Sequence, residues 1–239
     1  VVDGLRKDAQ FLGAVRRAIV TLPTDSHELP EDPFGPLDPL AVDTLRSRRV
    51  ALIASGGSGA LASMVGVWRA FEEAEITPSS VVVCSGSALY GLPLAAGRSA
   101  REVALFSLGI TPEDYVDINW RDLRRGALRA GRGFAGLIRG EKLEQTYRRL
   151  VGDMQLRDLP IPCYAPLWNV EENRLEYAGP RTHPDLDVAT AMRAAITIPL
   201  FLDPVTIGGT SWGDGGIVDF FPVEPVLGIE PVPDAVVGI

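Results

Sequence analysis

A serine and an aspartate occupy the two positions of this chain that are best suited to acyl-transfer chemistry. Ser87 follows Val81–Val83, a β-branched run typical of a short buried strand, and precedes a helix-like run that begins at Ala88. A serine at such a bend is lifted out of the sheet, with the positive end of the next helix behind it, which suits a nucleophile. The same position also suits a serine that only caps the helix. Asp214 lies much later, in a glycine turn that would hold a carboxylate in place.

A glycine-rich stretch could supply the third part of such a site. Val50–Ala54 is typical of a strand, and it leads into Ser55-Gly56-Gly57-Ser58-Gly59-Ala60 and a helical pattern. A strand, a glycine loop and a helix together present free backbone N–H groups to an anion. That anion could be a dinucleotide pyrophosphate, because Gly57-x-Gly59-x-x-Ala62 matches the dinucleotide-binding fingerprint, or the oxyanion of an acyl-transfer intermediate.

The end of the next strand favours the oxyanion. A dinucleotide site expects an acidic residue there, whereas this sequence has Cys84 and Ser85. A nucleotide-binding domain and a plain glycine turn stay open as weaker interpretations.

A histidine base is not expected for this serine. No histidine follows Asp214, and His183 stands before Pro184 in a predicted loop. The carboxylate of Asp214 would therefore have to accept the proton directly. Such a dyad needs a hydrogen bond between the two groups, a water-poor pocket that raises the pKa of Asp214, and strong oxyanion donors.

Composition narrows the class of protein. The chain has 239 residues, of which 46% are hydrophobic and 23% charged. Its net charge of −8 argues against nucleic acid as the main partner. Cys84 and Cys163 lie in apolar runs and are expected to be reduced core thiols. With two histidines and no CxxC or HExxH motif, we expect neither a metal site nor a cofactor.

The sequence also bears on location. No apolar run approaches the roughly 20 residues of a membrane-spanning helix, and no signal peptide is visible. We therefore expect a cytoplasmic or peripheral membrane protein. The chain starts at Val1 and stops within a strand-like run, 235–239, so we expect it to be a piece of a longer protein.

The remaining elements follow from periodicity and turn residues. They predict an N-terminal helical and Pro-rich extension over residues 1–49 and a catalytic domain over residues 50–239. The expected elements are a helix over 4–20, a Pro-rich connection over 22–39, a helix over 39–47 capped by Asp38, a helix over 88–96 kinked at Pro93, helices through 101–150, a hairpin of 161–170 with 174–178, and a helix over 185–196.

A basic segment stands out in this acidic chain. It contains Arg121, Arg124 and Arg125, and apolar residues such as Leu123 and Leu128 interrupt it. It could rest on an anionic membrane surface or hold lipid head groups. The alternative is a solvated helix face.

In combination, these motifs resemble the patatin-like phospholipase family, from about Val50 to Val223. The segments that resemble the family's motifs are Ala51–Gly57, Ser85–Leu89, Ala194–Phe201 and Asp214–Gly216. The resemblance implies an α/β fold of three α/β/α layers with a mainly parallel central sheet. It also implies metal-free hydrolysis of acyl esters of phospholipids or other lipids through an acyl-serine. By position, Ser87 is then the nucleophile, Asp214 the base, and the N–H groups of Gly56, Gly57 and Ser58 the oxyanion hole.

The chain departs from the family pattern in two places. Ser85 and Leu89 replace the two glycines of the elbow, and Ser58, Ala60 and Leu61 replace the last residues of the glycine motif. Ser85 could compete with Ser87 as nucleophile. Ser87 is preferred because it keeps the strand length and has the small Ala88 behind it.

These departures keep an alternative function open. It is a lipid-binding or regulatory module that retains the fold without turnover. The sequence does not separate hydrolysis from acyl transfer to another acceptor, and it leaves the oligomeric state open.

Overall fold

The computed structural model describes residues 39–57, 61–121, 123–124, 135–229 and 231–239. The chain divides into two units, Val1–Ala41 and Val42–Ile239. The helix predicted over residues 4–20 and the Pro-rich stretch with Asp38 lie outside the described residues. Helix α2, Pro39–Arg46, confirms the short helix predicted over 39–47. The division between an extension and a catalytic domain after residue 49 stays a prediction.

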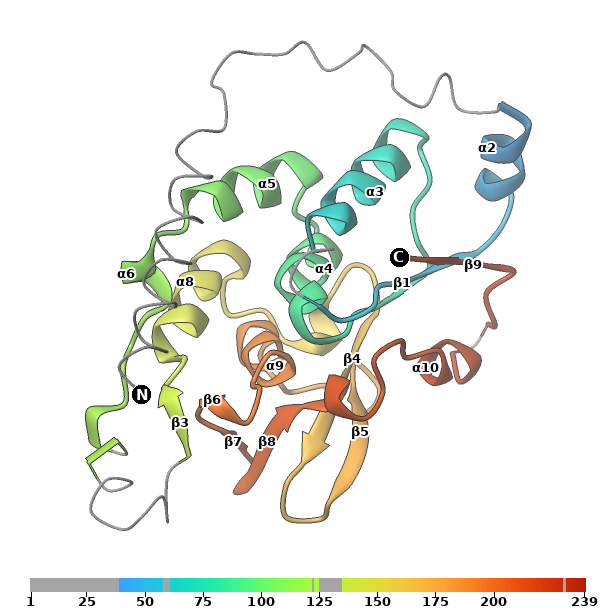
Figure 1. Cartoon of the computed structure of the whole chain (residues 1–239). Coiled ribbons are helices and arrows are strands. Elements are labelled where there is room, and N and C mark those ends of the chain that lie inside the picture. Colours follow the sequence, from blue (N-terminus) through green and yellow to red (C-terminus); the bar gives the residue numbers. More distant parts are fainter. Residues whose placement is uncertain (1–38, 58–60, 122, 125–134, 230) are drawn as a thin grey trace, which may run out of the picture. The chain divides into compact units, whose positions relative to one another are not determined.

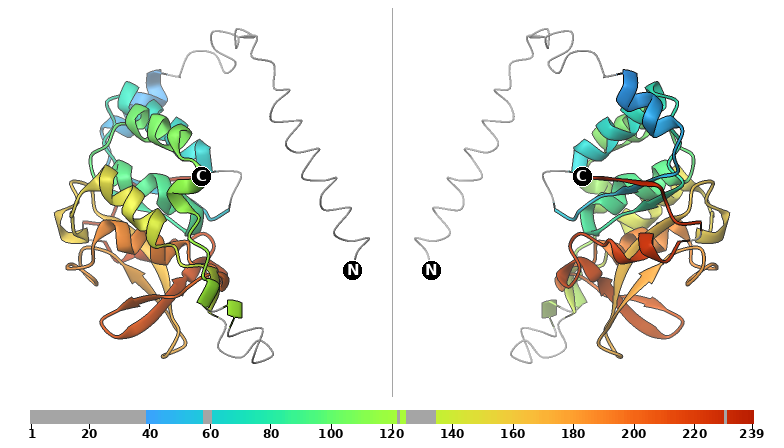
Figure 2. Two further views of the ribbon diagram at one scale, coloured as in Figure 1. Left: turned by 90° about the vertical axis from the view of Figure 1, so that its left-hand side faces the viewer. Right: turned by 90° about the vertical axis from the view of Figure 1, so that its right-hand side faces the viewer.

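Among the described residues, seven strands form one sheet in the order β7-β8-β4-β2-β1-β9, with β5 also paired to β4. Strands β9, β1, β2 and β4 run parallel, whereas β5 and β8 are antiparallel to β4. Figures 1 and 2 show β9, in dark red, beside β1, in blue. The predicted α/β class with a parallel central sheet is confirmed. The strands of this sheet are β1 (Val50–Ile53), β2 (Ser80–Val82), β4 (Cys163–Asn169), β5 (Arg174–Ala178), β7 (Val205–Ile207), β8 (Thr210–Asp214) and β9 (Ala235–Gly238).

Side chains alternate between the two faces of the sheet and build two apolar clusters. In β1, Val50 and Leu52 belong to the larger cluster, whereas Ala51 and Ile53 belong to the smaller one. The larger cluster contains buried residues of helices α3 (Leu61–Glu73), α4 (Ala88–Ala95), α5 (Ala100–Gly109), α8 (Glu141–Val151) and α9 (Val188–Ala195). In the described part of the chain, α10 (Glu224–Leu227) covers the other face through Val226.

The segment 101–150, predicted as helices, contains a strand. Helices α5, α6 (Pro112–Tyr115) and α8 agree with the prediction, but Gly136–Ile138 form β3, which pairs in parallel with β6, Leu200–Leu202. The pairing requires a close approach, because a Cβ on Gly136 would lie 2.5 Å from the carbonyl carbon of Leu202. The helical prediction was wrong here because the partner strand lies far away in the sequence.

Strand β4 brings two distant segments together. Strand β2 runs parallel to β4 and pairs with Cys163 and Tyr164, whereas β8 is antiparallel and pairs with Leu167–Asn169. The carboxyl ends of β2 and β8 therefore approach each other beside the middle of β4. The residues that follow Val82 meet Asp214, the last residue of β8.

Candidate active site

A sharp bend follows β2, and Ser85 lies in it. The N–H of Val83 still donates to Tyr164 O of β4 (2.9 Å), and the 3₁₀ turn Ser85–Ser87 then leads into α4. Ser85 has φ +49°, a left-handed conformation that non-glycine residues avoid because Cβ crowds the carbonyl oxygen. Such strain persists where the surroundings enforce it, and a strained strand-to-helix bend is the geometry that presents a nucleophile.

A glycine on the helix allows this bend to be tight. A Cβ on Gly91 of α4 would clash with Cγ1 of Val83. The helix can therefore pack onto the strand only because Gly91 has no side chain. Gly91 thus allows the close approach of helix and strand, although Ser85 and Leu89 stand where the family resemblance places the elbow glycines.

Ser85 donates a hydrogen bond to Asp214. The distance between Ser85 Oγ and Asp214 Oδ2 is 2.6 Å, in the range of strong hydrogen bonds to carboxylates. The other carboxylate oxygen, Oδ1, accepts from the N–H of Gly216 at 2.7 Å. Asp214 is 3% exposed, and burial raises its pKa above the ordinary value, while the hydrogen bonds from Ser85 and Gly216 partly oppose that shift.

Ser87 does not meet Asp214, contrary to the sequence-based prediction. Its buried hydroxyl donates to Cys84 O (2.9 Å) and accepts from the N–H of Cys84 (2.8 Å), so it closes the turn that carries Ser85. The expected dyad placed the bend two residues too late, because β2 ends at Val82 rather than at Cys84. Ser85, the competing serine, occupies the elbow.

The glycine loop is only partly available as an oxyanion site. The N–H of Gly56 donates to Phe220 O at 3.1 Å, so this predicted donor already has an acceptor. Gly57 has φ +120°, which a residue with a side chain would rarely adopt. Ser58 lies outside the described residues.

The segment after Asp214 ties the loop and the aspartate together. Gly215 packs on β4, where a Cβ would lie 2.5 Å from the carbonyl carbon of Pro166. The N–H of Asp219 donates to Gly215 O (3.0 Å), and the hydroxyl of Tyr177 donates to Asp219 Oδ2 (2.7 Å). The same segment supplies the Phe220 carbonyl that holds Gly56.

A family model described as patatin-like phospholipase matches residues 52–227. This chain belongs to that family. It is 29% identical over 185 residues to uncharacterized NTE family proteins of Mycobacterium bovis and Mycobacterium tuberculosis; each alignment covers 77% of this chain and 47% of the relative. The chain thus spans about half the length of the curated relatives it matches. VipD from Legionella pneumophila has a similar fold, with a TM-score of 0.55 and 14% identity over 80% of this chain and 49% of VipD.

A cavity of this patatin-like domain lies beside Asp214. This cavity, of about 350 Å³, is mostly apolar. Its lining residues are Ala135, Trp168, Val170, Thr197, Pro199, Leu200, Pro204, Gly213, Asp214 and Ile217. Several come from segments far from Asp214 in the sequence, so sequence reasoning could not assemble them.

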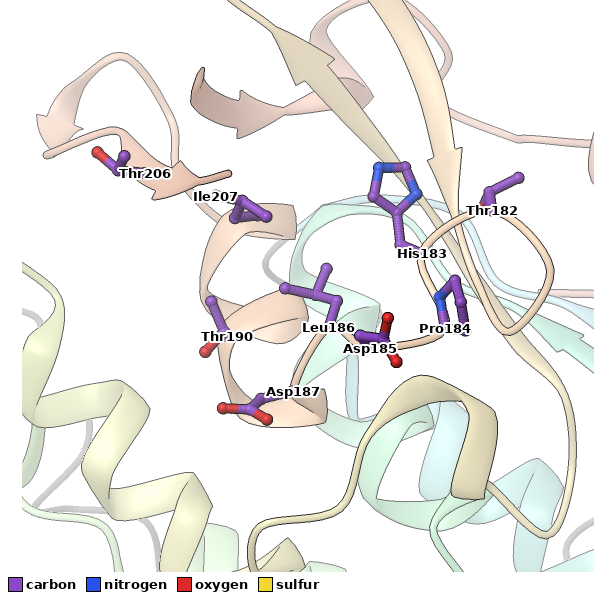
Figure 3. A pocket seen from close by; sticks show the side chains of 9 residues that line it. All are labelled: Thr182, His183, Pro184, Asp185, Leu186, Asp187, Thr190, Thr206 and Ile207. Atoms are coloured by element: carbon purple, nitrogen blue, oxygen red, sulfur yellow. The ribbon is translucent and has the colours of Figure 1, made fainter. Parts of the chain in front are cut away.

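His183 lines a second cavity, and the residues that line this cavity include neither Ser85 nor Asp214 (Figure 3). His183 lies in the predicted loop, with its ring edge to face against Trp212 at a centroid distance of 5.5 Å. Burial lowers the pKa of His183, and the nearby charge of Glu176 partly opposes the shift. The structure thus pairs the candidate nucleophile with a carboxylate and leaves His183 in a separate pocket of this patatin-like domain.

The cysteine next to Ser85 is an unsuitable nucleophile. Burial, and then the charges of Asp214 and Asp219, raise the pKa of Cys84 to about 12, so its thiol stays protonated. Its Sγ donates to Asp219 O at 3.4 Å. Cys163 is fully buried in β4.

The predicted basic segment is described in part. Arg121 and Arg124 are exposed, whereas Arg125 lies outside the described residues. Over the described part of the chain, no helix combines the length and apolar character needed to cross a membrane. Within the same residues, no group of three His, Cys, Asp or Glu side chains is placed to hold a metal ion.

Proposed function

We propose that this chain is a lipid acyl hydrolase in which Ser85 is the nucleophile and Asp214 is the general base. The observation that carries the proposal is the 2.6 Å hydrogen bond from Ser85 Oγ to Asp214 Oδ2 at a strained bend. A weakly basic carboxylate can serve a serine hydroxyl only when the two are in direct contact and the pKa of the carboxyl is raised. Both conditions hold for this pair.

The proposed reaction has two halves. Ser85 Oγ attacks the acyl carbonyl carbon while its proton passes to Asp214 Oδ2, and the carbonyl oxygen becomes an oxyanion. The tetrahedral intermediate expels the alcohol, which takes the proton from Asp214, and the acyl group stays on Ser85. Water then attacks this ester, gives its proton to Asp214, and releases the fatty acid as Ser85 recovers its proton.

For the oxyanion we propose the N–H groups of Gly57 and Gly86. Gly86 follows the nucleophile, and the amide at that position commonly forms one half of an oxyanion hole. Gly57 lies at the end of the described glycine loop, next to Gly56, whose N–H donates to Phe220 O. This assignment replaces Gly56 and retains Gly57 of the three predicted donors. Ser58 stays a prediction.

We further propose that the substrate is drawn from a lipid surface. Several apolar side chains in the segments that flank Asp214 are exposed, among them Leu200, Phe201, Ile217 and Phe220. Trp120 is 63% exposed beside Arg121, and an aromatic next to a cation suits the head-group region of a membrane. Liposome co-sedimentation should weaken for Trp120→Ala and for Arg121→Ala with Arg124→Ala; unchanged binding would remove these residues from docking.

Hydrolysis assays test the function directly. Wild type, Ser85→Ala and Ser87→Ala should be compared on a p-nitrophenyl acyl ester and on phosphatidylcholine liposomes, with thermal melting of each variant as the control for folding. We expect hydrolysis by wild type and Ser87→Ala, and none above background by Ser85→Ala. Equal rates for wild type and Ser85→Ala would refute the assignment.

A lipid-binding module without turnover is the second candidate. The hydrogen bond from Gly56 N–H to Phe220 O favours it, because one expected oxyanion donor is occupied. Liposome binding by a wild-type protein that neither hydrolyses esters nor reacts with a fluorophosphonate would establish this candidate in place of the hydrolase.

A further inference from the structure

The turn that leads into β6 has an unusual residue at the first position of the strand. Ile198–Phe201 form a β-turn in which the N–H of Phe201 donates to Ile198 O at 3.1 Å and Pro199 takes the second position. Leu200, at the third position, has φ +72°. A turn of this kind, with proline second and a left-handed residue third, normally has glycine at the third position. A leucine there strains the backbone.

The surrounding structure enforces this conformation. Leu200 is paired with Gly136 in the two-stranded sheet of β3 and β6, and the absence of a side chain at Gly136 allows the strands to come close. The N–H of Leu202 also donates to Ile198 O (3.1 Å), and the N–H of Asp203 donates to Ile138 O (2.9 Å). Hydrogen bonds on both sides of Leu200 therefore hold the turn in place.

Burial in the core does not offset this strain, because the side chain of Leu200 lies outside the core. It is 63% exposed and lines the apolar cavity that also contains Asp214. A strained residue that lines a cavity beside reactive groups is a candidate for contact with a ligand. Trp168, Pro199 and Ile217 line the same cavity, so the ligand portion that it accepts is apolar.

We propose that Leu200 is a specificity-determining residue that contacts the acyl chain of the substrate in this cavity. The inference rests on the proposed hydrolase function, because it places the acyl chain next to the carboxylate that serves Ser85. A volume of about 350 Å³ is at the lower end of the roughly 300–1,000 Å³ of small-molecule sites. It suits one unbranched hydrocarbon chain rather than a whole phospholipid.

The test compares acyl esters of different chain length. We would measure kcat/KM for p-nitrophenyl acetate and octanoate with wild type, Leu200→Gly and Leu200→Asn. Glycine and asparagine both tolerate a left-handed backbone, so melting temperatures should stay at or above that of wild type. Removing the leucine side chain should lower the octanoate-to-acetate ratio of kcat/KM by about tenfold, the effect of losing a partly buried apolar contact.

Leu108→Ala is the matched control. Leu108 is 85% exposed near the end of α5 and does not line the cavity beside Asp214, so the ratio should equal that of wild type. A ratio for Leu200→Gly within twofold of wild type would overturn the inference while leaving the hydrolase proposal intact.

A binding measurement separates the two proposals. Binding of a fluorescent C16 fatty acid should be weaker for Ser85→Ala with Leu200→Gly than for Ser85→Ala alone. If wild type hydrolyses no ester, the hydrolase proposal fails, and this binding difference still tests the role of Leu200. Equal fatty-acid binding by the two variants would overturn the contact with the acyl chain.

Discussion

Because Ser85 has a left-handed backbone, a variant with glycine at this position should be more stable than one with alanine. This order is the reverse of the usual one and therefore tests the elbow. Ser85→Ala and Ser85→Gly both remove the hydroxyl that Asp214 accepts, so that loss cancels between them. At φ +49°, a Cβ destabilises the folded state by about 1–2 kcal/mol relative to glycine. Glycine loses about 0.4–1 kcal/mol through the greater freedom of its unfolded chain. With the middle of each range, Ser85→Gly should therefore be more stable than Ser85→Ala by about 0.8 kcal/mol.

Urea and thermal unfolding would measure this difference. For a chain of this length, it corresponds to a shift in melting temperature of about 1–4 °C. The same two substitutions at Ser87 provide the control, because Ser87 has φ −65° and alanine should then be the more stable. A Ser85→Ala variant as stable as Ser85→Gly would refute the strained bend, and with it the structural reason for choosing Ser85.

Three further predictions follow from the same site. Ser87→Ala should lower the free energy of unfolding by about 1–3 kcal/mol, because the buried N–H of Cys84 loses its acceptor. The variant should still hydrolyse esters, and loss of hydrolysis in a folded protein would contradict this prediction. Asp214→Asn should lower kcat/KM by about 10²–10⁴-fold. Asp214 accepts the proton as a carboxylate, so its protonation at low pH should remove activity. Because its pKa is raised, wild-type activity should begin to fall at a higher pH than it would with an exposed aspartate. A pH–rate profile that stays flat down to pH 4 would count against Asp214. Gly91→Ala should cost about 1–3 kcal/mol by overpacking against Val83, and Val83→Ala in the same chain should restore part of it; additive losses would show that the two do not meet.

Local sequence patterns were sufficient for much of the fold. The β-branched runs predicted β1 and β2, and turn residues predicted the hairpin of β4 and β5. Strand β3 could not be predicted in this way, because Gly136–Ile138 become a strand only through pairing with β6. Local propensity carries no information about a partner more than 60 residues away.

The sequence predicted that a serine meets Asp214, but the structure places Ser85 there instead of Ser87. The approach of a serine to Asp214 followed from the order of the motifs, but the strand was assumed to reach Cys84, which placed the bend at Ser87. The available signal was Gly86, a small residue directly after Ser85 that eases a tight bend. The cavity residue Trp168 had no such signal, because it comes beside Asp214 only through the pairing of β4 with β8. Leu200 lies in the family-like segment Ala194–Phe201, but the resemblance assigned it no role.

Fluorophosphonate labelling followed by mass spectrometry of the modified peptide tests the central claim most directly, since the probe forms a bond only with an activated nucleophile. We predict a single adduct on Ser85 in wild type and in Ser87→Ala, and no adduct in Ser85→Ala. An adduct on Ser87, or labelling that persists in Ser85→Ala, would contradict the account.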